Sequence, residues 1–420
     1  MDLLPLSLER SGSYPLEVEL SADTLFSHTI WDIRPHAHRL ASLRCHIEGT
    51  DPLFLQIFSQ LDRSLILHTL SIETARAPTV DSQEIEIGLV SGDMPSLHTL
   101  ELLPFPITPQ FMRFRHLTSL QLDVGYSTLT DVLDLLAANP SLEKVRLLGN
   151  FEDSEDERTA GGIFLKHLRF LTVERSMTCT FLEKLTLPRG TRIFIRYSII
   201  THLVPFTPPL PQSMRGYANL QGLTSLWVLL AFQNETYIDA TGPNGSVAME
   251  FMDRQDASFV CNAIDLLPAT DITQLVCEFH PALTPVKIDK VKKMMDMLPH
   301  LEEIILIHFD GKDVERFLST LTITNGWKKL LRLKFVHCRQ LMNWIGNLIE
   351  TAAERMDRGL KLDIVAVVSE GEEGLRDMFD LLKGFVGRVE EVEVGAGEVI
   401  RSEQVWDDAD CTARLTSVPV

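Results

Sequence analysis

The chain has 420 residues, and 45% of them are hydrophobic. A chain of this length is too long to fold around a single ordinary domain core. The chain has 39 basic and 58 acidic residues, which gives a formal net charge of -19. This charge argues against nucleic acid or an anionic membrane as a partner. The six cysteines form no Cys-x-x-Cys pair, which favours reduced core thiols over a disulfide framework or a zinc site.

In chain order, alternating apolar and polar residues first predict a half-buried strand over residues 14–20. Asp51-Pro52 then predicts the start of a helix, with Asp as the N-cap. After it, a phrase of the form Leu-x-x-Leu-x-Leu recurs, in several places behind a Pro that ends the preceding helix. In the first half of the chain these phrases begin at Leu67, Leu97, Leu117, Leu142 and Leu168.

The middle of the chain departs from this pattern. Residues 192–197 alternate as a strand does, and the prolines of residues 205–211 predict an irregular stretch. Another repeat phrase begins at Leu223. Residues 236–252 hold two strand-like runs around an Asn-Gly turn, which predicts a β-hairpin inserted into the repeats.

The second half is more regular. Its repeat phrases begin at positions 272, 301, 330, 362 and 389, separated by helical patterns, and this spacing is typical of leucine-rich repeats that return through a full helix. The sequence therefore predicts an α/β leucine-rich-repeat solenoid over residues 1–394, with a curved, mostly parallel sheet backed by helices. We expect residues 395–420 to form a partly disordered C-terminal tail.

Three phrases resemble the repeat portion of basidiomycete F-box-like proteins. Residues 8–18 are similar to the phrase that follows the F-box in that family, and residues 92–97 and 187–192 resemble two of its repeat steps. The resemblance implies a non-enzymatic domain that holds the substrate of a cullin-type ubiquitin ligase. Only seven residues precede Leu8, so we expect binding to the ligase adaptor only if an F-box exists upstream. The alternative is a ligase-independent scaffold or a truncated gene product.

Residues between the inward leucines of such a solenoid face outward along the concave side of the sheet, which is the usual binding surface. We expect a protein partner there, although the same positions also suit plain solvated strand residues. Ile305 and Ile307 are expected to be exposed unless a loop covers them. The candidate binding residues are Glu101, Gln121, Asp123, Lys144, Arg146, Glu303, Ile305, Ile307, Arg332 and Lys334.

The sequence contains no phosphate-binding loop, no Gly-x-Ser-x-Gly elbow and no His-Glu-x-x-His motif. The N-terminal histidines, at positions 28, 36, 38 and 46, suit ordinary surface or core roles better than a metal site. We therefore expect no catalytic residues, no cofactor and no metal, and an enzyme is the least favoured alternative. Without a signal peptide or an apolar run of about 20 residues, a cytoplasmic or nuclear protein is expected.

Overall fold

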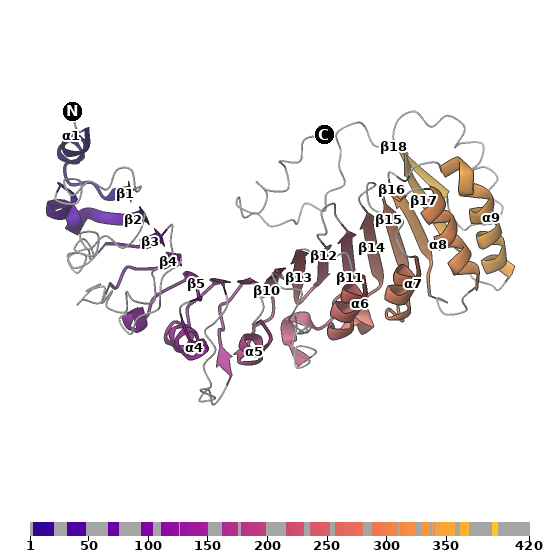
Figure 1. Cartoon of the computed structure of the whole chain (residues 1–420), viewed down its shortest axis with the longest axis horizontal. Helices are drawn as coiled ribbons and strands as arrows, with labels where there is room; N and C mark the ends of the chain where they lie inside the picture. Colours follow the sequence, from indigo (N-terminus) through magenta and orange to yellow (C-terminus); the bar gives the residue numbers. More distant parts are fainter. Residues whose placement is uncertain are drawn as a thin grey trace. The chain divides into compact units, whose positions relative to one another are not determined.

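A computed structural model of the chain is shown in Figure 1. It describes residues 3–20, 32–47, 66–74, 94–103, 111–125, 127–149, 162–174, 178–198, 216–230, 236–252, 257–279, 288–309, 311–323, 329–336, 338, 341–357, 362–368 and 389–393. The chain divides into two compact units, Met1–Leu301 and Glu302–Val420, and each is described by itself. That residues 1–394 form one continuous domain stays a prediction.

The sheet of the first unit begins with strands that follow chain order, each parallel to the next. These strands are β1 (Leu16–Leu20), β2 (Leu40–Ile47), β3 (Thr69–Thr74), β4 (Thr99–Leu103), β5 (Ser119–Asp123), β6 (Lys144–Leu148), β8 (Phe170–Glu174) and β10 (Arg192–Ser198). A separate pair, β7 (Ile163–Phe164) and β9 (Leu185–Thr186), forms a two-stranded sheet.

Figure 1 shows α4 and α5 along one side of the strands from β5 to β10. The α-helices of this unit are α1 (Leu3–Arg10), α4 (Leu129–Ala138), α5 (Thr178–Glu183), α6 (Ala257–Leu266) and α7 (Ile288–Asp296). Short 3-10 turns add η2 (Arg34–Arg39), η5 (Phe111–Arg113), η7 (Ala218–Leu220) and η9 (Ala269–Asp271). Thr128 caps α4 in a reciprocal capping box with Asp131, which satisfies backbone donors at the start of that helix.

The repeat phrases form the strands that the sequence predicts. Leu97, Leu100 and Leu102 are buried, whereas the residues between them on β4 keep part of their surface exposed. The same alternation holds on β5 and β6. It follows from the two-residue period of a strand, which sends leucines to the core and polar residues to the opposite face.

Successive repeats are joined at the beginning of their strands. The carbonyls of His98, Thr118 and Glu143 each accept hydrogen bonds from two backbone N–H groups at the start of the next strand. Asn139 is fully buried between two repeats, where its side chain accepts from the Leu117 N–H and donates to the Leu135 carbonyl. These contacts fix the step from one repeat to its neighbour, because buried backbone groups must be paired.

The predicted hairpin is confirmed, and the structure adds where it lies. β12 (Thr236–Gly242) and β13 (Gly245–Met252) pair in antiparallel fashion, but they stand inside the sheet rather than beside it. The order is β10-β13-β12-β11-β14, with β11 at Ser225–Leu230 and β14 at Gln274–Phe279. β13 is therefore parallel to β10, and β14 to β11, while β12 runs opposite to its two neighbours.

The second unit repeats the same architecture on a smaller scale. β15 (Glu303–Ile307), β16 (Arg332–Val336), β17 (Asp363–Val368) and β18 (Val389–Glu393) are parallel and follow chain order. α8 (Gly311–Ile323) packs against α9 (Leu341–Asp357). The buried Arg355 of α9 donates to the Leu330 carbonyl, which joins this helix to the turn that leads into β16.

The structure thus confirms an α/β fold with a large, mostly parallel sheet and helices. Leucine-rich-repeat identity and sheet curvature stay predictions. The helix predicted to start at Asp51 and the tail over residues 395–420 lie outside the described residues. Among the helices that the structure describes, none is long and apolar enough to cross a lipid bilayer.

Candidate functional site

We use "outward face" for the strand residues whose side chains alternate with the buried core positions. In the first unit it carries five of the predicted binding residues, on three adjacent strands. The register places Glu101 beside Gln121 and Gln121 beside Arg146, so these three form one row. The other two of the five, Lys144 and Asp123, flank this row, all five side chains being half-buried.

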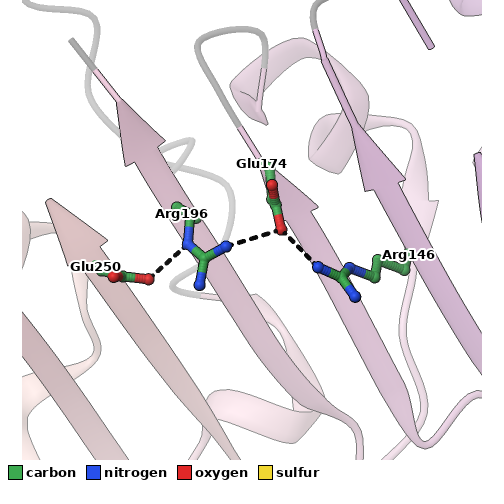
Figure 2. Close-up of polar contacts among 4 residues, drawn as sticks. All are labelled: Arg146, Glu174, Arg196 and Glu250. Atoms are coloured by element: carbon green, nitrogen blue, oxygen red, sulfur yellow. Dashed lines mark hydrogen bonds and ion pairs between the residues drawn. The ribbon is translucent and has the colours of Figure 1, made fainter. Parts of the chain in front are cut away.

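A ladder of ion pairs continues this face across four neighbouring strands (Figure 2). Arg146 of β6 and Arg196 of β10 both contact the same carboxylate oxygen of Glu174 on β8, each at 3.2 Å. Arg196 also reaches Glu250 of β13, with 2.6 Å between its Nε and Glu250 Oε2. Positive and negative charges therefore alternate, and the four side chains, which we call the charge ladder, are formally neutral together.

The charge ladder is half-buried rather than freely solvated. Its side chains are 15% to 27% exposed, and Arg196 lies directly opposite both Glu174 and Glu250 in the sheet register. Water screens half-buried ion pairs less than fully exposed ones. The two carboxylates of Glu174 and Glu250 therefore hold the Arg196 guanidinium firmly in one position. Arg146 lacks one bond, since its buried Nε has no hydrogen-bond partner in the described part of the chain.

Aromatic rings accompany the charges on the middle strands. The Arg196 guanidinium lies 5.6 Å from the ring centroid of Phe194, and that of Arg192 lies 5.9 Å from Phe170. Cationic groups are attracted to ring faces at such distances. Phe170 is more than a third exposed, so this part of the face combines charge with accessible apolar surface.

On the hairpin side, Trp227 of β11 lies directly opposite Asp239 of β12. The Trp227 ring is 5.4 Å from that of Tyr237, edge to face. Burial raises the pKa of the Asp239 carboxyl to about 6, and the positive charge of Arg192 only partly offsets this rise. The Trp227 Nε1 and Asp239 Oδ1 atoms are both buried, and neither has a hydrogen-bond partner among the described residues.

The other five predicted residues belong to the second unit. Glu303 and Arg332 form an ion pair at 3.4 Å, in which the arginine side chain is half exposed. Lys334 of β16 lies beside Ile305 of β15 in the sheet register. Ile305 and Ile307, which were expected to be exposed unless a loop covers them, are half-buried and keep part of their surface accessible. The accessible apolar residues of the described chain include Phe164, Phe170 and Leu331.

Cys45 and Cys277 are buried, and His46 lies between two carboxylates. Burial raises the pKa of the Cys277 thiol to about 12 and also raises that of Cys45, so both stay protonated at neutral pH. His46 lies between Glu73, at 2.9 Å, and Glu19, at 3.6 Å, on the outward face of the first strands. No cluster of His, Cys, Asp and Glu able to hold a metal ion occurs among the described residues.

Of the residues described above, sequence reasoning identified Arg146 but missed Arg196, Glu250, Trp227 and Asp239. A signal for Arg196 was present, since residues 192–197 alternate in the manner of a strand and put both of their arginines on one face. No comparable signal joined Arg196 to Glu250, which is 54 residues away. Comparison with known proteins supplies no family: no protein-family model matches this chain, and no curated protein matches it.

Proposed function

We propose that this chain is a non-enzymatic protein-recognition module, and that its partner binds to the outward face of the strands. The observation that carries this proposal is the charge ladder of Arg146, Glu174, Arg196 and Glu250. Charged side chains held in fixed positions can orient a protein partner and select it by complementary charge. They also lose little conformational entropy on binding, because they are already ordered in the free protein.

Two further features support the same role. The outward positions of β4, β5 and β6 keep part of their surface exposed, while the inward positions are buried. The exposed ring of Phe170 next to the arginines is of the kind that forms the centre of an interface, where aromatic residues and arginine are enriched. The net charge of -19 favours a partner with a basic surface.

A site-specific photo-crosslinker tests this proposal. Placed at Gln121 on β5, it should capture a discrete protein partner from an extract of the source organism. The same crosslinker at Asp134, an exposed position on α4, is the matched control and should capture that partner much less. Equal capture from both positions, or none from either, would remove the outward face as the binding surface.

The resemblance to basidiomycete F-box-like proteins carries a narrower form of the proposal, in which the partner is the substrate of a cullin-type ubiquitin ligase. The adaptor of that ligase would then bind an F-box encoded upstream of the present sequence, and the protein would work in the cytoplasm or the nucleus. Mapping the 5′ end of the transcript tests this form. An in-frame F-box segment is the expected result, whereas a stop codon directly before Met1 would leave a ligase-independent scaffold.

A further inference from the structure

Trp227 and Asp239 lie side by side on the outward face, and each has a buried polar atom without a hydrogen-bond partner among the described residues. They are direct neighbours on antiparallel strands, and their side chains share one face of the sheet. On the other side of Asp239 the register places Ala248 of β13, whose methyl group cannot bond to the carboxylate. The Trp227 Nε1–H and the Asp239 Oδ1 are both buried and have no partner in the described part of the chain.

Buried polar atoms of this kind are uncommon in folded proteins, where the great majority are hydrogen-bonded. A buried donor and a buried acceptor in adjacent positions on an interaction surface are therefore suited to a ligand that supplies an acceptor and a donor. A peptide segment does both, because its carbonyls accept and its amides or basic side chains donate.

The charge of the site selects among these groups. With a pKa of about 6, the Asp239 carboxyl is mostly ionised at pH 7. Arg192 acts on it through space, but no ion pair to Asp239 occurs among the described residues. An incoming cation would neutralise this buried carboxylate, and the adjacent rings of Trp227 and Tyr237 are the surroundings in which a guanidinium or an ammonium is stabilised.

We propose that Trp227 and Asp239 receive a basic residue, arginine or lysine, of the partner protein. The side chain of that residue donates to the Asp239 carboxylate, and a peptide carbonyl of the same segment accepts from the Trp227 Nε1–H. This inference rests on the proposed function and makes it specific, since it places a positively charged contact of the partner at the neighbouring strands β11 and β12.

Short peptides test the site directly in the full chain. The probes are acetyl-Gly-Arg-Gly-amide, its lysine counterpart, and the same peptide with neutral citrulline in place of arginine. The readout is the indole N–H signal of Trp227 in nitrogen-edited NMR spectra, identified among the five tryptophans by its loss in Trp227→Phe. The arginine and lysine peptides should move this signal, with the citrulline peptide binding about tenfold more weakly because it lacks the charge.

Asp239→Asn should reduce binding of the arginine peptide to the level of the citrulline peptide. Asp134→Asn makes the same chemical change on α4 and should leave binding unaltered. The unmodified chain gives a second test that needs no variant, since binding of the arginine peptide should weaken severalfold from pH 7 to pH 5 as Asp239 takes up a proton.

Equal binding of the arginine and citrulline peptides, or a Trp227 signal that no basic peptide moves, would overturn this site. Crosslinking from Gln121 would be untouched by that result. The proposed function and this inference therefore fail in separate experiments.

Discussion

Replacing Arg196 by Met removes a side chain that contacts two carboxylates, while keeping an apolar stem of similar length. Glu250 then loses its arginine, and Glu174 keeps only Arg146. Breaking a fully buried ion pair costs about 3–5 kcal/mol, and an exposed pair contributes about 0–1 kcal/mol. Since Arg196 and Glu250 are each 22% exposed, we expect Arg196→Met to lower the free energy of unfolding by about 2–3 kcal/mol.

Urea denaturation followed by circular dichroism measures this loss, with an unchanged m-value as the check that only stability has moved. Arg169→Met is the matched control in the same unit, because the Arg169 side chain is 70% exposed and lies 3.7 Å from Glu143. It should cost less than about 0.5 kcal/mol.

A double-mutant cycle with Glu250→Met isolates the pair itself, and the coupling energy between positions 196 and 250 should be about 1–2 kcal/mol. If Arg196→Met costs no more than Arg169→Met, the charge ladder is not a fixed element of the fold and does not form a prearranged interaction surface.

Three further outcomes follow from other positions. The raised pKa of Asp239, about 6 against an ordinary 3.8, means that the folded chain binds this proton more tightly than the unfolded chain. Ionisation of Asp239 therefore lowers the stability of the fold as pH rises from about 3.8 to about 6, and the loss is complete above that range. Asp239→Asn should accordingly raise the melting temperature at pH 7.5 and have no effect near pH 3, as thermal melts across this range can show. Gly242→Ala would place a methyl group in collision with the Gly222 carbonyl oxygen, and urea titration should show a loss of about 1–3 kcal/mol that Gly216→Ala, in open space, does not share. Asn139→Ala leaves two buried backbone groups unpaired and should cost about 1–3 kcal/mol in the same titration, with Ser141→Ala, at an exposed turn position, close to neutral.

The strands could be predicted from sequence because burial alone dictates their pattern. The phrase beginning at Leu97 has only one way to hide its three leucines, which is to form a strand with polar residues on the opposite face. The hairpin turn could also be predicted, since the dipeptide Asn244-Gly245 favours a tight turn between two antiparallel strands. Both features depend on the local sequence alone and not on the elements that pack beside it.

The place of the hairpin could not be predicted in this way. Nothing in residues 236–252 says that β13 will pair with β10 while β11, which comes earlier in the chain, stands beyond β12. Tertiary packing decides which strands lie at the edge of a sheet and which lie inside it. The alternation of apolar and polar residues in one sequence is the same for both and does not reveal this position. Because Arg196 meets Glu250 only through that choice, this contact of the charge ladder could not be predicted either.

The position of the hairpin also orders events during synthesis. From β2 to β10, each strand of the large sheet pairs with the large-sheet strand that precedes it in the chain, so the chain as far as Ser198 can add repeats as it leaves the ribosome. β11 breaks this sequence, because both of its neighbours, β12 and β14, are encoded after it. A nascent polypeptide ending at Leu230 would carry a strand with neither neighbour yet made, and the ribosome must add the hairpin before that strand can join the sheet.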